Sequence, residues 1–276
     1  MPRLNRFYTI LGWLAVAYMA LLFLYPLLRV FATSVVADEG VTFSNYERIF
    51  SSSVYMIVLG RTMWLSFVST AVSLLMGYAL AYFIASRSKR TQGVWLMLII
   101  SPMFMSLTIR LYGWMILLSN EGPVAALLKT FSPSGTAPTL LFSSFSVIAG
   151  IVHYVLPFIV LNVYTSLKKL NPSFLEASTM LGASRFRTFW KVTFPLSLPG
   201  VFAGASVSFA LSANTFLVPI MLGGPGNNML SNIAYNTTIT VGNVGLGSAI
   251  SIVLLAIVVG VLLIAGWWER RGHHAA

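Results

Sequence analysis

Six apolar stretches dominate this sequence, and each is long enough to cross a membrane. They cover residues 8–30, 62–85, 94–118, 144–165, 201–222 and 244–268. A hydrocarbon core about 30 Å thick needs about 20 apolar residues per helical crossing. Only 8% of the 276 residues are charged, against about 25% in an average soluble domain. The sequence therefore predicts an all-α membrane protein, with six transmembrane helices in one domain spanning residues 1–276.

The basic residues predict the orientation of these helices. With the N-terminus inside, twelve Lys and Arg residues fall on the inner side: Arg3, Arg6, Arg87, Lys89, Arg90, Lys168, Lys169, Arg185, Arg187, Lys191, Arg270 and Arg271. Arg48, Arg61 and Lys129 fall outside, while Arg29 and Arg110 lie within apolar stretches. Because cytoplasmic loops retain Lys and Arg, both termini are predicted to be cytoplasmic. The net charge of +11 is thereby explained without nucleic acid as a partner.

The first stretch predicts an anchored helix rather than a cleaved signal peptide. Arg3 and Arg6 precede it, and Val35-Val36-Ala37 loosely matches a cleavage site. The apolar core of a signal peptide is only about 7 to 15 residues long, however, and removing this stretch would leave an odd number of crossings. The segment after it, residues 38–59, predicts a short helix near the outer surface, around Val54 and Ile57.

Residues 168–199 form a cytoplasmic connection that is far longer than two adjacent helices need. Asn171-Pro172 predicts the start of a helix, with an N-cap followed by proline in the first turn. Gly182 suits the left-handed residue that often ends a helix. Ser184 then predicts the cap of a second helix, which Pro195 and Pro199 are expected to end. Two short helices joined at a glycine could lie on the membrane surface or enter a groove on another protein.

A spaced motif in this segment resembles a known family. Glu176-Ala177-Ser178, three residues, Gly182, nine residues, Val192, one residue and Phe194-Pro195 resemble the EAA motif in permease subunits of ATP-binding-cassette importers. Ser178, Val192 and Phe194 depart from the family's Ala, Ile and Leu. The resemblance implies a coupling helix that docks on an ATPase subunit. It makes these residues the candidates for ATPase coupling: Glu176, Ala177, Ser178, Leu181, Gly182 and Pro195.

Three further segments resemble the spermidine/putrescine-type branch of these permeases. They are Gly77-Tyr78-Ala79-Leu80-Ala81-Tyr82-Phe83 with Arg87, Arg110-Leu111-Tyr112-Gly113-Trp114, and Leu222-Gly223-Gly224. The branch implies a bacterial inner-membrane protein surrounded by lipid, with a second permease subunit. The sequence leaves open whether that subunit is a second copy or a different chain, and the branch commonly uses two different chains. The branch also implies an extracytoplasmic solute-binding protein and an ATPase dimer. Because the sequence has no GxxxxGK[ST] phosphate loop, no cofactor is expected on this chain, and ATP and Mg²⁺ are expected on the ATPase.

Four residues are candidates for lining a solute pathway: Arg110, Tyr112, Trp114 and Asn214. An unpaired charge such as Arg110 is costly within the membrane unless it faces a cavity or a partner, although its long stem could also reach the headgroups. Asn214 could line a pathway or bond neighbouring helices. His153 is alone among the crossings, which favours a structural hydrogen bond over a metal site.

The branch makes a polyamine the first expectation for the solute. Arg110 favours an anionic or zwitterionic solute almost as strongly, because a guanidinium pairs with anionic groups.

Two other classes of membrane protein are alternatives to an importer permease. A stand-alone ion-coupled transporter usually needs ionisable groups at mid-membrane, yet none of the six stretches contains Asp or Glu. An intramembrane enzyme needs a nucleophile with a base, for which His153 has no obvious partner.

Overall fold

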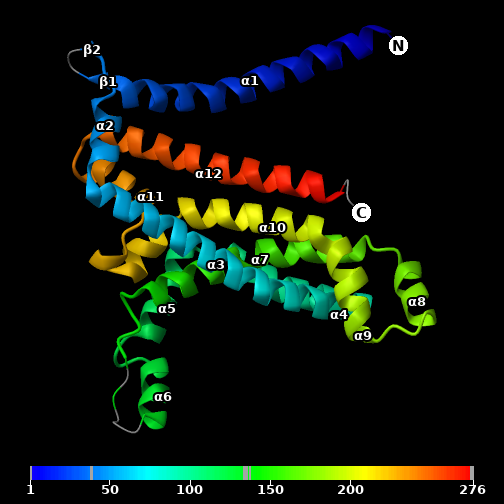
Figure 1. Ribbon diagram of the computed structural model, residues 1–276. Helices are drawn as coiled ribbons and strands as arrows, with labels where there is room; N and C mark the ends of the chain where they lie inside the picture. The colour runs from blue at the N-terminus through cyan, green and yellow to red at the C-terminus, as the bar shows by residue number, and fades with distance from the viewer. Residues whose placement is uncertain (1, 38–39, 133–135, 137, 274–276) are drawn as a thin grey trace.

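The computed structural model describes residues 2–37, 40–132, 136 and 138–273, and helices make up most of the fold (Figure 1). Within this part of the chain, the strands are a single antiparallel pair, β1 (Val36–Ala37) and β2 (Gly40–Val41). This pair follows α1 (Pro2–Val35) and precedes the short helix α2 (Ser44–Ser51). The predicted all-α membrane fold is confirmed.

Within the part of the chain that the structure describes, five long helical runs are apolar enough to cross a membrane. These apolar runs lie in α1, in α3 (Ser53–Ala85), in α7 (Ser144–Lys168), in the continuous run Arg185–Asn214, and in α12 (Val244–His273). The second crossing begins at Ser53 rather than at residue 62, and Val54 and Ile57 belong to it. A short outer helix was correctly predicted within residues 38–59. It is α2, however, which ends before Val54 and Ile57.

The third crossing is broken, whereas the sequence predicted one continuous helix over residues 94–118. Lys89–Phe104 and Leu107–Phe131 meet at an angle of 97°. The first arm contains α4 (Lys89–Ile100) and the 3₁₀ turn η1 (Ser101–Phe104), and the second contains α5 (Leu107–Leu118) and α6 (Pro123–Phe131). Pro102 lacks an N–H for the Leu98 carbonyl, and the Ser101 hydroxyl donates to that carbonyl instead, at 3.0 Å. The two arms together form the sixth candidate crossing.

The fifth crossing also differs from the predicted residues 201–222. It consists of α9 (Arg185–Thr188), the π-helical turn η2 (Phe189–Thr193) and α10 (Phe194–Asn214), so it starts earlier and ends earlier. Pro219 cannot donate to the Thr215 carbonyl, and the Ser231 hydroxyl does so at 2.6 Å. The chain then forms short outer elements: η3 (Pro219–Gly223), η4 (Pro225–Asn227), α11 (Leu230–Tyr235) and η5 (Asn236–Thr240).

Helices α3, α7 and α10 pack at the centre of the bundle, where small residues allow close approach. A Cβ at Gly77 of α3 would lie 2.6 Å from Cγ2 of Ile159 on α7. A Cβ at Gly200 of α10 would lie 2.7 Å from the carbonyl oxygen of Asn162 on α7 and would also strike the Ser166 side chain. Lipid gives little hydrophobic drive for helices to associate, so van der Waals packing at such positions holds the bundle together.

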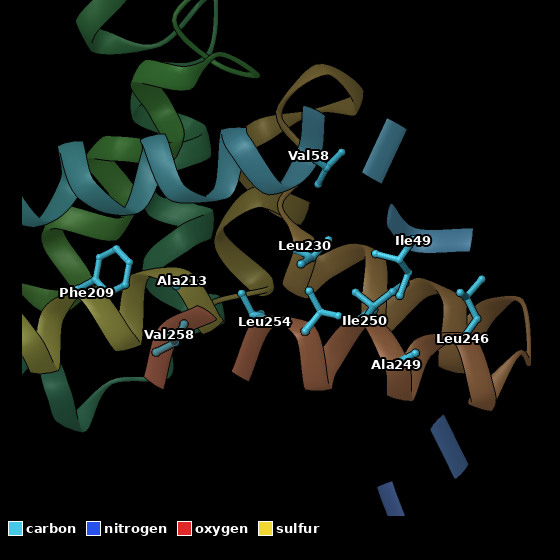
Figure 2. Packing of buried hydrophobic residues seen from close by; sticks show 12 residues of the cluster. Ile49, Val58, Phe209, Ala213, Leu230, Leu246, Ala249, Ile250, Leu254 and Val258 are labelled. Carbon is cyan, nitrogen blue, oxygen red and sulfur yellow. The ribbon is translucent and has the colours of Figure 1, made fainter. Parts of the chain in front are cut away.

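Figure 2 shows one of the buried clusters, at the junction of α2, α3, α10, α11 and α12. Ile49 of α2, Leu230 of α11 and Ile250 of α12 are each at most 1% exposed. Helix α1 is different: none of the central residues of its crossing is buried. It contacts α12 near its own end, where the hydroxyls of Thr33 and Ser248 lie 2.9 Å apart.

The two sides of the bundle can be followed in Figure 1. The start of α1, the end of α12 and helix α8 (Pro172–Met180) lie at one end, and α2 and α6 lie at the other. This arrangement agrees with the predicted orientation, in which both termini and the segment 168–199 share the cytoplasmic side.

Candidate functional site: the cytoplasmic coupling segment

The candidate site is built on α8, which begins as the sequence predicted. Asn171 is the N-cap, and its side-chain oxygen accepts a hydrogen bond from the Ser173 N–H at 3.1 Å. Pro172 occupies the first turn, where a missing N–H costs nothing because that donor has no partner within the helix. The start of α8 is therefore fixed by local chemistry.

The end of α8 is a tight left-handed turn at Gly182. The Ala183 N–H donates to the Ser178 carbonyl at 3.1 Å, and the Gly182 N–H donates to the Thr179 carbonyl at 3.0 Å. This pair of bonds is the Schellman motif. It requires φ of +75° at Gly182, a value that glycine adopts without the clash that a Cβ would cause. The predicted helix-ending role of Gly182 is confirmed.

The second cytoplasmic helix begins at Ser184, whose hydroxyl accepts from the Arg187 N–H at 3.4 Å. The prediction that Pro195 and Pro199 end this helix is wrong, because α9, η2 and α10 form one unbroken run. The π-helical turn η2 precedes Pro195, and the Phe194 N–H bonds to the Phe189 carbonyl five residues back. This wider turn accommodates a residue that cannot donate. The segment 168–199 is thus continuous with a membrane crossing.

Helix α8 presents two different faces. Toward the bundle, the Ser178 and Thr188 hydroxyls lie 2.8 Å apart and join α8 to α9. Toward solvent, Met180 and Leu181 are 90% and 88% exposed. Figure 1 shows α8 projecting from the end of the bundle. Large apolar side chains at a projecting tip are suited to contact with another protein.

The predicted coupling residues lie in three different environments. Glu176, Ala177, Leu181 and Gly182 are exposed on α8 and the turn that follows it, whereas Ser178 is turned toward α9. Pro195 lies in α10 and is not part of the projecting tip. Sequence reasoning missed the role of Thr188, although a hydroxyl ten residues after Ser178, across a predicted turn, offered a signal.

Arg110 lies in the first turn of α5, four residues after the break, with Ser106 at the cap. Its Nε and Nη1 atoms are buried, and no hydrogen-bond partner for them is present among the described residues. Tyr154 and His153 of α7 are close enough to interact with it electrostatically. The guanidinium therefore lies within electrostatic range of α7, with two of its nitrogen atoms buried.

The other pathway candidates are only partly brought together. Trp114 also faces α7, where its indole N–H donates to Nδ1 of His153 at 3.0 Å, which confirms a structural hydrogen bond for this histidine. Tyr112 is 56% exposed. Asn214 is exposed at the end of α10 and donates to the Ala210 carbonyl of its own helix at 2.8 Å. The structure thus groups Arg110 and Trp114 on the α7 side and leaves Tyr112 and Asn214 outside that group.

A bundle of membrane crossings with a capped helix projecting from one end is the architecture of a multi-pass membrane protein. The family model of the binding-protein-dependent transport system inner membrane component matches residues 73–273. The chain is 31% identical to the spermidine/putrescine transport system permease protein PotB of Escherichia coli (strain K12), over 95% of this chain and 96% of PotB. It is 28% identical to the inner membrane ABC transporter permease protein YdcU of the same organism, over 93% and 87% of the two chains.

The fold agrees with solved permeases. A chain of a bacterial ABC transporter involved in the import of the acidic polysaccharide alginate superposes with a TM-score of 0.79, with 98% of each chain covered and 17% identity. The chain therefore belongs to the family of binding-protein-dependent transport system inner membrane components, the permeases of ATP-binding-cassette importers. It is a multi-pass inner-membrane transport subunit, and the alternatives of an ion-coupled transporter and an intramembrane enzyme are wrong.

Proposed function

We propose that this chain forms one half of the translocation path of an ATP-driven importer, and that α8 docks on a separate ATPase subunit. The observation that carries the proposal is the projecting, capped α8 with Met180 and Leu181 almost fully exposed. The ATPase dimer binds ATP and Mg²⁺, because the chain has no phosphate loop of its own. A second, different permease completes the path, and an extracytoplasmic binding protein delivers the solute.

The proposed coupling works as a lever. Ser178 and Thr188 tie α8 to α9, and α9 continues through η2 into the crossing α10. A displacement of α8 by the ATPase therefore moves α10 against α7 and α3. ATP shifts the access state only if α8 contacts the nucleotide-bound and nucleotide-free ATPase with different free energies.

The proposed solute is a polyamine or a similar small organic molecule. The support is the 31% identity to PotB, whose name states spermidine and putrescine transport. This chain has six Asp and Glu residues, all outside the predicted apolar stretches, so carboxylates that hold a polycation must come from the partner permease or the binding protein. The buried Nε and Nη1 atoms of Arg110, which have no hydrogen-bond partner among the described residues, favour an anionic or zwitterionic solute as the second candidate.

Proteoliposomes test this function directly. The chain, co-purified with its second permease and ATPase, is reconstituted and supplied with the binding protein and radiolabelled spermidine. We expect uptake that requires ATP, the binding protein and every subunit. Solute uptake by this chain alone, without nucleotide, would remove the proposal.

A further inference from the structure

A cavity of about 560 Å³ lies between α8 and the neighbouring ends of α3, α7 and α9. Pro172, Leu175 and Thr179 line it from α8, with the spacing of one helix face. The remaining walls come from the inner ends of α3 and α7 and from α9 and η2. The coupling helix is therefore separated from the bundle by a space, and the Ser178–Thr188 hydrogen bond bridges the two beside it.

The lining of this cavity combines two kinds of chemistry. Tyr82, Leu167, Leu175 and Phe189 supply apolar and aromatic surface, while Lys168 and Arg185 supply positive charge. None of the described residues that line it is acidic. Within the described residues, neither Lys168 nor Arg185 has an ion pair, since the ion pair found there joins Lys129 and Glu121. The cavity thus offers two unpaired cations beside an apolar wall.

The level of the cavity in the membrane is marked by aromatic rings. Tyr82 and Phe189 pack edge to face with centroids 5.4 Å apart, and Trp190 packs on Phe189 at 5.3 Å. Nearby, the guanidinium of Arg87 lies 4.3 Å from the centroid of the Phe83 ring. Aromatic rings of this kind gather at the boundary between hydrocarbon and headgroups. The cavity therefore lies at the headgroup level of the cytoplasmic leaflet.

We propose that this cavity binds one anionic phospholipid of the cytoplasmic leaflet. Lys168 and Arg185 pair with the phosphate of the headgroup, and the adjoining acyl and glycerol groups lie against Tyr82 and Phe189. Basic pockets between transmembrane helices on the cytoplasmic side favour such headgroups. A soluble phosphate would leave the apolar wall unused, which favours the lipid. The bound lipid fills the space between α8 and the bundle and so supports the coupling helix.

The site goes beyond the proposed transport function and can be tested without transport. The complex is purified from nanodiscs containing equal amounts of phosphatidylglycerol and phosphatidylcholine, and native mass spectrometry counts the lipids it retains. The test variant is Lys168→Gln with Arg185→Gln. The matched control is Lys169→Gln with Arg187→Gln, which removes the same charge from exposed neighbours that do not line this cavity.

We expect the test variant to bind phosphatidylglycerol about 30-fold more weakly, since each of the two basic residues near the surface contributes about fivefold, while the control retains it. Equal retention by the test and control variants would overturn the proposal. Displacement of the retained phosphatidylglycerol by millimolar inorganic phosphate alone would also overturn it, because the ligand would then be a soluble phosphate. Lipid retention is measured without ATP or solute, so its result is independent of the proposed import.

Discussion

At the scale of single residues, Ser178 shows how a departure from a family motif can have a structural reason. The motif has Ala at this position, whereas here the Ser178 hydroxyl lies 2.8 Å from that of Thr188 and holds α8 to α9. Ser178 therefore serves the attachment of α8 rather than its outer face. The proposed docking on the ATPase would therefore use the exposed residues at the tip, above all Met180 and Leu181.

Cysteine labelling tests that assignment, because the chain contains no cysteine of its own. Met180→Cys is expected to react rapidly with a maleimide in the isolated permease and to be protected at least tenfold when the ATPase is bound. Lys89→Cys, at the exposed start of α4, is the control and should react equally in both states. Equal reactivity of Met180→Cys with and without ATPase would contradict docking at the tip.

Arg110 supports a second prediction at this scale. Losing a charge-assisted hydrogen bond to a solute costs about 1.5 to 3 kcal/mol, so Arg110→Gln should lower uptake of an anionic solute about 10- to 100-fold and leave polyamine uptake nearly unchanged. Uptake is measured for polyamines, amino-acid-like solutes and phosphonates. Arg48→Gln, which removes an exposed outer charge, is the control. Unaltered uptake of every solute would mean that Arg110 does not act on the solute.

At the scale of elements, glycines set the contact between α7 and α10. In Gly200→Val, the new side chain would meet the Asn162 carbonyl oxygen and Ser166. Overpacking of this kind costs about 1 to 3 kcal/mol. We expect a lower unfolding temperature for the purified chain in detergent. Gly60→Val, in α3 with open space around it, is the control, and an equal effect of both substitutions would contradict the packing account.

The sequence predicted the elements best where the signals were local. The start of α8 at Asn171-Pro172 and its end at Gly182 depend on capping within a few residues, and both were predicted correctly. The break at Pro102 and the continuation through Pro195 were not, because each depends on substitute hydrogen bonds and on a wider helical turn. A membrane helix can either break at a proline or continue through it. Sequence alone does not distinguish these two cases.

In the candidate site too, positions that depend on local sequence were predicted correctly, whereas contacts between distant residues were not. The positions of Glu176, Ala177 and Leu181 on the exposed segment follow from helix periodicity and the motif spacing. The pairing of Trp114 with His153 joins residues 39 positions apart, and only the packing of α5 on α7 brings them together. Asn214 was grouped with Arg110 by polarity, but the structure places it at the end of α10 with its side chain bonded to its own helix.

At the scale of the whole molecule, the chain leads from the projecting helix α8 through a short turn into a membrane crossing. Helix α8 projects at the same end as the start of α1 and the end of α12 (Figure 1), and the turn at Gly182 leads into the run Arg185–Asn214. This run packs on α7 and α3, the centre of the bundle. We expect motion of α8 to reach the proposed translocation path through this turn.

The ratio of solute uptake to ATP hydrolysis in proteoliposomes tests that claim most directly. In Gly182→Val, a β-branched residue must adopt φ near +75°, a conformation that costs about 1 to 3 kcal/mol, so the turn should change its geometry. The account predicts a complex that inserts and assembles normally but loses at least tenfold in uptake per ATP hydrolysed, while Gly93→Val, in open space on α4, keeps the original ratio. Unchanged uptake together with unchanged stimulation of ATP hydrolysis in Gly182→Val would contradict it.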